Sequence, residues 1–156
     1  MKLKELRKEK KMTQQQVADL VGVCLRSYKS YENEKRKEGT IKYDYMISKL
    51  EEVNKIDEEN GVLEIEDIKE ICAKVFEKYE VYYCYLFGSY AKGYAKGNSD
   101  VDLLVSTKAR GIDFYGLIED LRVNLHKRVD LLDLKQLENN FNLTKEILED
   151  GVKIYG

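Results

Sequence analysis

The sequence contains no proline, a single histidine (His126) and three cysteines: Cys24, Cys72 and Cys84. Three scattered cysteines are too few for a disulfide framework or a zinc site, so we expect them to be reduced and packed as small apolar side chains. The only histidine is interpreted as a surface helix residue rather than as a catalyst. No apolar run approaches the roughly 20 residues of a membrane span, and the lysine-rich start lacks the apolar core of a signal peptide. These absences favour a cytoplasmic protein with no membrane partner.

The charges are distributed unevenly along the 156 residues, although the net charge is only −2. Residues 1–55 hold 14 Lys and Arg against 9 Asp and Glu, whereas the remainder holds 13 against 20. A basic first part followed by an acidic body suggests that the first part binds a polyanion. An imbalance of this size also describes an ordinary solvated surface, so the sequence pattern inside the basic part must decide.

Two carboxylates, Asp100 and Asp102, stand one residue apart at the start of the apolar run 101–105. In an extended strand, residues i and i+2 point to the same face, so these side chains should lie together. Carboxylates so close repel one another unless a cation lies between them, and hard oxygen ligands suit Mg²⁺. A lone Asp-x-Asp pair is more often a solvated strand edge or a turn, so the residues around it decide its meaning.

The residues around the pair suggest a place for phosphate. Gly88 and Ser89 follow the apolar run 81–87, which predicts a strand that ends in a sterically open turn. Such a turn lets backbone N–H groups and a hydroxyl approach phosphate oxygens. Ten residues separate Ser89 from Asp100, and a third acidic strand follows around Asp130. A phosphate-binding turn beside a metal-binding pair is what nucleotidyl transfer requires.

Over residues 65–155 this combination resembles the nucleotidyltransferases of the DNA polymerase beta superfamily, and most closely the small bacterial minimal nucleotidyltransferases (MNT). The resemblance implies three catalytic carboxylates that ligate two Mg²⁺ ions: Asp100, Asp102 and Asp130. It implies ATP as the substrate, with the triphosphate gripped by Gly88, Ser89 and Lys92. Family members commonly carry arginine after Gly-Ser, whereas lysine here offers a point charge and no bidentate fork.

The basic first part has the pattern of a helix-turn-helix. Leu3 and Leu6 indicate a short amphipathic helix, Thr13 is a good N-cap for a second helix over 14–21, and Gly22 permits a sharp turn before a third helix over about 24–33. The run 12–37 resembles the phage-repressor (Cro/C1, or XRE) family. The residues that carry this resemblance are Thr13, Gln14, Ala18, Gly22, Val23, Tyr28, Tyr31, Glu32 and Asn33.

In the repressor family the third helix enters the major groove of DNA. The resemblance implies base contacts by Leu25, Arg26 and Ser30. It implies phosphate contacts by Gln14, Lys29 and Lys35. Arg26 is the residue best suited to read guanine. Cys24 at the helix start and Glu34 in place of a glycine depart from the family pattern, and they leave open a helical bundle with no DNA role.

We therefore expect an α+β protein of two domains. An all-α helix-turn-helix domain should occupy residues 1–56, completed by a helix over 40–56. A polar linker should follow at 57–63. A mixed-sheet nucleotidyltransferase domain, with helices packed on one face, should occupy residues 64–156. Its expected order is helix 65–79, strand 81–87, strand 101–105, helix 114–127, strand 129–134 and helix 144–149.

The favoured function is that of an MNT antitoxin. The resemblance implies transfer of AMP from ATP to a tyrosine of a HEPN-domain ribonuclease toxin, while the first domain binds duplex operator DNA as a homodimer and represses its own operon. Two alternatives remain open: an enzyme acting on a small hydroxylated molecule such as an antibiotic, and a repressor whose second domain only senses nucleotide. The first alternative would normally need a further substrate-binding domain, and the second has no need of three carboxylates.

Overall fold

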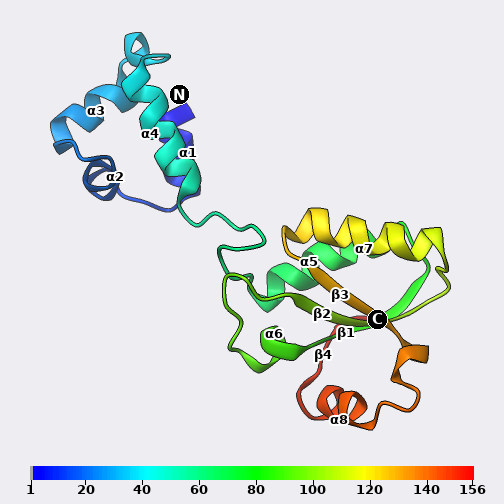
Figure 1. The fold of residues 1–156 in the computed structure, drawn as a ribbon. Helices are drawn as coiled ribbons and strands as arrows, with labels where there is room; N and C mark the ends of the chain where they lie inside the picture. Colours follow the sequence, from blue (N-terminus) through cyan, green and yellow to red (C-terminus); the bar gives the residue numbers. More distant parts are fainter. Residues whose placement is uncertain (1) are drawn as a thin grey trace. The chain divides into compact units, whose positions relative to one another are not determined.

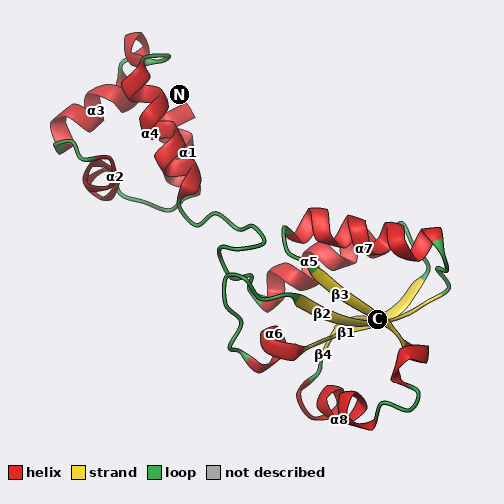
Figure 2. Cartoon of the chain, viewed as in Figure 1, coloured by secondary structure: helices red, strands yellow, loops and turns green. Residues whose placement is uncertain are grey.

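The computed structural model describes residues 2–156, and its contacts divide the chain into two units, residues 1–55 and 56–156 (Figure 1). Each unit has its own apolar core. Figure 2 shows that the first unit contains helices and loops, whereas the strands lie in the second. None of the helices within residues 2–156 has the length and apolar character needed to cross a bilayer.

Within residues 2–55, the first unit consists of four α-helices and one 3₁₀ turn. They are α1 (Lys2–Glu9), α2 (Gln14–Val21), α3 (Leu25–Asn33), η1 (Lys35–Lys37) and α4 (Ile41–Glu52). A capping box fixes the start of α2, because the Thr13 hydroxyl accepts from the Gln16 N–H and the Gln16 side chain accepts from the Thr13 N–H. Gly22, with φ 74°, ends α2 in the left-handed conformation that glycine adopts without strain. The α2–turn–α3 arrangement confirms the expected helix-turn-helix, while α4 is shorter than expected.

A buried ion pair joins the helices of the first unit. The Glu32 side chain is fully buried and accepts hydrogen bonds from Arg7 Nε at 2.9 Å and Nη2 at 2.8 Å. Gln14 Nε2 also donates to Glu32, at 3.3 Å. Burial raises the pKa of Glu32, but the hydrogen bonds and the positive charge of Arg7 outweigh it, so the pKa lies below its ordinary value.

We expect acid to destabilise the first unit through Glu32. Because the folded pKa is lowered, the pair stabilises the fold above the unfolded pKa of 4.5, and this contribution is lost as the pH falls through the folded value. Glu32→Gln should cost about 3 kcal/mol at pH 7, because it leaves Arg7 buried without its partner. Thermal unfolding followed by circular dichroism should show a loss of stability as the pH falls below about 4.5, and this loss should be weaker in Glu32→Gln. Equal pH dependence in both proteins would contradict this assignment.

The second unit is built around a four-stranded mixed sheet. Its elements are α5 (Ile65–Phe76), β1 (Val81–Phe87), α6 (Gly88–Lys92), β2 (Val101–Thr107), α7 (Ile112–Leu125), β3 (Val129–Asp133), η2 (Leu134–Leu137), α8 (Phe141–Asp150) and β4 (Val152–Tyr155). The strand order is β3-β2-β1-β4, with β2 and β3 parallel and the other pairs antiparallel. The expected α+β class and mixed sheet are confirmed, whereas α6 and β4 were not expected.

The two faces of the sheet are covered differently. Leu86 and Leu103 point into the main core with α5 and α7, which lie together on one side of the sheet (Figure 1). Phe87 and Leu104 point to the opposite face, where a smaller cluster includes Ile147 of α8. Helices therefore cover one face as expected, and α8 adds partial cover on the other. Since alternate residues of a strand face opposite sides, Asp102 shares the α8 face with Leu104.

Residues 57–63, which the sequence suggests as a linker, lie in the second unit. The Leu63 side chain is 7% exposed and belongs to the main core. The buried ammonium of Lys127 donates to the backbone carbonyls of Asn60 at 3.0 Å and Gly61 at 2.6 Å. The polar composition of this segment is that of a linker, but contacts with residues far along the chain hold it against the rest of the second unit.

Candidate active site

The parallel pairing of β2 and β3 brings the predicted carboxylates to one end of the sheet. Asp102 and Asp130 are direct partners across the two strands, and Asp100 lies one residue before Val101, where β2 begins. Residues paired in this way point to the same face. The face is the one partly covered by α8, so the main core on the other side supports the carboxylates without occupying their space.

Gly88 approaches Asp102 from the neighbouring strand. Phe87, the last residue of β1, pairs with Asp102, and Gly88 follows with a φ of 71°. A Cβ atom at Gly88 would overlap the carboxylate of Asp102. The backbone conformation therefore favours glycine, and a side chain at this position would displace the Asp102 carboxylate. The turn that carries Ser89 lies next to the carboxylates, as the sequence predicts.

Burial and charge make the ionised form of Asp102 costly. Burial, and after it the negative charges of Asp130, Asp100 and Glu146, raise the pKa of Asp102 to about 6. Glu146 comes from α8 and was not expected at the site. Its carboxylate accepts a hydrogen bond from Lys92 Nζ at 2.8 Å, so Lys92 is engaged by a protein carboxylate in this conformation. Repulsion of this kind is relieved when a cation binds between the carboxylates.

The donor chemistry of this site fits a hard divalent ion, because Asp102 and Asp130 are paired across adjacent strands and Asp100 directly precedes β2. Within residues 2–156, however, no group of three or more His, Cys, Asp or Glu side chains is arranged so that it could hold a metal ion. The Asp100 carboxylate instead accepts a hydrogen bond from Arg128 Nε at 3.1 Å. The three carboxylates are thus neighbours, but one of them is already bound to a positively charged side chain.

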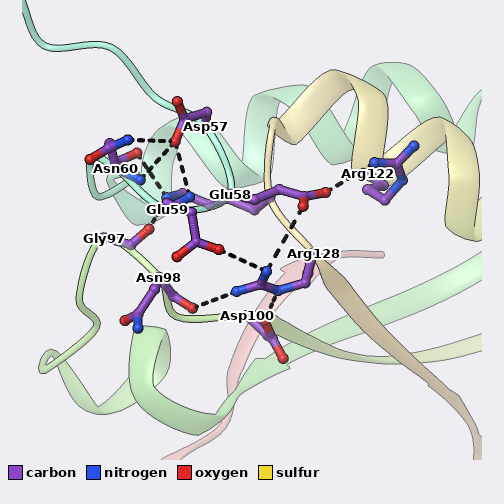
Figure 3. Close-up of polar contacts among 10 residues, drawn as sticks. Asp57, Glu58, Glu59, Asn60, Gly97, Asn98, Asp100, Arg122 and Arg128 are labelled. Carbon is purple, nitrogen blue, oxygen red and sulfur yellow. Dashed lines mark hydrogen bonds and ion pairs between the residues drawn. The ribbon is translucent and has the colours of Figure 1, made fainter.

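Two basic residues before β3 organise the loop that leads to Asp100. Lys127 is fully buried, and its ammonium also donates to the backbone carbonyl of Gly97 at 2.5 Å. Burial lowers the pKa of Lys127, and the charges of Asp57 and Glu59 oppose this. Arg128 donates to the carbonyl of Asn98 at 3.2 Å (Figure 3). In the sequence, both residues look like ordinary solvated charges, so no local signal indicates this role.

Comparison with known families decides what kind of site this is. The family model "Polymerase beta, Nucleotidyltransferase" matches residues 66–156, which is more than half of the chain. The chain belongs to this nucleotidyltransferase family. A second model, described as "Helix-turn-helix", matches residues 3–37. Both resemblances proposed from the sequence are thereby confirmed, and the second unit is a nucleotidyltransferase.

Individual relatives of this nucleotidyltransferase include a protein of Methanocaldococcus jannaschii named "Putative protein adenylyltransferase MJ1379". It is 35% identical over 98 residues, which cover 58% of this chain and 97% of the relative. A crystal structure described as a toxin-antitoxin with AMP-PNP has 27% identity and a TM-score of 0.49 over 56% of this chain and 73% of the other. A structure described as a tri-AMPylated Shewanella oneidensis HEPN toxin in complex with MNT antitoxin contains a matching chain. The match has 23% identity and a TM-score of 0.46, and it covers 59% of this chain and 72% of the other.

The first unit of the nucleotidyltransferase presents only part of the predicted DNA-reading surface. Arg26, Lys29 and Lys35 are exposed, and Leu25 and Ser30 are partly buried. The Ser30 hydroxyl donates to Glu34 at 2.5 Å. The Gln14 amide points inward to Glu32, so both polar side chains have partners within the protein. Cys24 occupies the N-cap of α3 without a side-chain hydrogen bond, and it is exposed, so it is not packed as the sequence suggested for the cysteines.

Proposed function

We propose that the second unit is a Mg²⁺-dependent enzyme that transfers AMP from ATP to a tyrosine of a HEPN-domain toxin. The observation that carries the proposal is the pairing of Asp102 with Asp130 beside the Gly88–Ser89 turn. This arrangement joins a set of carboxylates to a turn that can approach a triphosphate. The name of the Methanocaldococcus jannaschii relative supports a protein as the acceptor. The HEPN partner and its tyrosine follow from the resemblance to MNT antitoxins.

Each residue has a distinct part in the proposed reaction. Asp100, Asp102 and Asp130 would hold the metal, which when bound supplies positive charge to the triphosphate and activates the acceptor oxygen. The backbone at Gly88 and the Ser89 hydroxyl bind phosphate oxygens. The acceptor hydroxyl attacks the α-phosphorus, the bond from that phosphorus to the bridging oxygen breaks, and pyrophosphate leaves. Asp130 accepts the proton of the acceptor hydroxyl.

Asp130→Asn should reduce turnover far more than ATP binding. The amide keeps the shape of the side chain but neither accepts the proton nor carries the charge, while the Gly88–Ser89 turn remains intact. We expect a rate loss on the order of 100-fold or more and only a few-fold loss of ATP affinity. Single-turnover kinetics measures the rate, and calorimetry measures the affinity. The control is Asp113→Asn, which changes an exposed carboxylate at the start of α7. Equal losses in rate and affinity would point to a structural role for Asp130.

We further propose that the first unit binds operator DNA as a homodimer and represses transcription of its own operon. The exposed positive side chains of Arg26 and Lys29 lie three residues apart on α3, which places them on one side of the helix. Two such helices related by a two-fold axis would read half-sites about one DNA turn apart. Leu25 offers only an apolar contact, so Arg26 carries most of the proposed base recognition.

Arg26→Ala and Lys29→Ala should have different effects on DNA binding. Loss of a base-reading arginine should cost about 1–3 kcal/mol and relax the preference at one position in each half-site. Loss of a phosphate contact should weaken binding to all sequences alike and reduce the salt dependence. Gel shifts with the upstream region of the gene, repeated over a salt series, measure both effects. If no salt-sensitive complex forms at micromolar protein, the DNA-binding proposal is wrong.

A further inference from the structure

Arg128 lies beside the candidate metal ligands, and its guanidinium contacts one of them. Arg128 lies one residue before β3, and Asp100 lies one residue before β2. Because the first residues of the two strands are paired, as are Asp102 and Asp130, Arg128 and Asp100 occupy equivalent positions. Its Nε donates to Asp100 Oδ1 at 3.1 Å. A positive charge is therefore present at one of the carboxylates that the proposed function assigns to a divalent cation.

The other side-chain partners of Arg128 lie in the segment 57–61. Arg128 Nη1 donates to Glu59 Oε1 at 3.0 Å and lies 3.9 Å from Glu58 Oε2 (Figure 3). Glu58 is also paired with Arg122, at 3.0 Å. Figure 3 shows the guanidinium between the two sets of acceptors, with Asp100 on one side and the glutamates on the other. Arg128 can thus lose one set of partners and keep the other.

The two glutamates are held in place by contacts that do not involve Arg128. Asp57 Oδ1 accepts from the backbone N–H of Glu59 at 3.0 Å and of Asn60 at 2.8 Å. The buried Lys127 ammonium binds the carbonyls of Asn60 and Gly61. The backbone that carries Glu58 and Glu59 would therefore keep its position if the guanidinium moved away from Asp100.

The ion pairs of Arg128 are exposed enough to exchange. The side chains of Arg128, Asp100 and Glu59 are 44%, 51% and 66% exposed. Pairs with this exposure are weak, because water and salt screen them and each side chain keeps other favourable positions. A divalent ion at Asp100 would repel the guanidinium, whereas Glu58 and Glu59 attract it.

We infer that Arg128 is an internal competitor of the metal ion. It neutralises Asp100 when no metal is bound, and it moves toward Glu58 and Glu59 when a divalent cation takes its place. Arg128 and the two glutamates are positioning residues that set the affinity of the site for the cation. This inference rests on the proposed function, because it takes Asp100 as a metal ligand.

The test is direct binding of Mn²⁺, a paramagnetic substitute for Mg²⁺, to the full chain without nucleotide. Electron paramagnetic resonance measures the free Mn²⁺. Arg128→Gln should bind Mn²⁺ about three- to tenfold more tightly than the wild type, because a positive charge close to the site is removed. Arg128→Lys keeps the charge and should stay near the wild-type affinity. If Arg128→Gln binds Mn²⁺ with unchanged or lower affinity while remaining folded, the inference is wrong.

Matched variants separate competition from general charge effects. Arg122→Gln removes an arginine whose ion pairs are with Glu58 and Glu119 instead of Asp100, so its effect should be much smaller. The double change Glu58→Gln with Glu59→Gln should weaken Mn²⁺ binding several-fold, and this effect should shrink in the Arg128→Gln background. An equal effect in both backgrounds would overturn the role of the glutamates.

Asp100→Asn distinguishes failure of this inference from failure of the proposed function. If Asp100→Asn binds Mn²⁺ as tightly as the wild type, Asp100 is not a ligand and the proposed metal site is wrong. If Asp100→Asn abolishes binding but Arg128→Gln does not tighten it, the metal site stands and only the competition by Arg128 is refuted. Circular dichroism spectra establish that each variant is folded.

Discussion

Asp102→Asn should lower the rate of AMP transfer on the order of a thousandfold or more, without loss of stability. The substitution removes a proposed metal ligand from the centre of the site, beside both Gly88 and Asp130. It keeps the volume of the side chain, so the surrounding packing should not change. The variant should bind little metal. It should transfer no measurable AMP at enzyme concentrations where the wild-type reaction is complete within minutes.

The stability of this variant makes the prediction specific. Burial and the neighbouring negative charges raise the pKa of Asp102 to about 6, so at pH 7 its ionisation destabilises the folded state. An amide does not ionise, so the free energy of unfolding should hold or rise by on the order of 1 kcal/mol. Denaturant unfolding beside the transfer assay measures both quantities. Transfer above one tenth of the wild-type rate by a folded Asp102→Asn would contradict the assignment.

Gly88→Ala should lower AMP transfer on the order of 100-fold, while Gly93→Ala should change it only a few-fold. Both glycines have positive φ, 71° and 84°, so alanine is strained at each by about 1–2 kcal/mol. A Cβ at Gly88 would also overlap the Asp102 carboxylate, whereas a Cβ at Gly93 meets no atom within 4 Å. The two variants therefore have similar backbone strain, and only Gly88→Ala displaces the Asp102 carboxylate.

The comparison of Gly88→Ala with Gly93→Ala needs both rates and stabilities. Transfer is measured at a temperature where unfolding curves show both variants to be folded. A selective loss in Gly88→Ala would indicate that the position of the Asp102 carboxylate limits the reaction. Equal losses of activity in the two variants would mean that strain in the turn, rather than contact with Asp102, explains the requirement for glycine at position 88.

The parts of the fold that the sequence predicts well have strong local signals. The strand Val81–Phe87 is an apolar run closed by a glycine, and the helix Gln14–Val21 has a capping threonine before it and a glycine after it. Both boundaries match the expectation. The Asp-x-Asp spacing predicts two carboxylates on one strand face, but only Asp102 lies within β2, and Asp100 directly precedes it. The third carboxylate needed the family resemblance, because the pairing of β2 with β3 is not local.

The elements that the sequence did not predict are short or depend on distant contacts. α6 has five residues and β4 has four, too few for a periodic pattern to stand out. The segment 57–61 has the acidic, glycine-containing composition of a linker. It is nevertheless bound by Lys127 and Arg128, which lie more than 60 residues further along the chain. Glu146 reaches the site from α8 in the same way. Propensity and spacing carry no information about such pairs.

The central claim, transfer of AMP by the second unit, is tested most directly by following the two ends of ATP. The full chain is incubated with Mg²⁺ and a HEPN-domain protein offered as the acceptor, using ATP labelled at the α-phosphate in one reaction and at the γ-phosphate in another. We predict that the α-label becomes covalently attached to the partner, that the γ-label appears in pyrophosphate, and that Asp102→Asn gives neither. Attachment of the γ-label to the partner, or undiminished α-labelling by Asp102→Asn, would contradict the account.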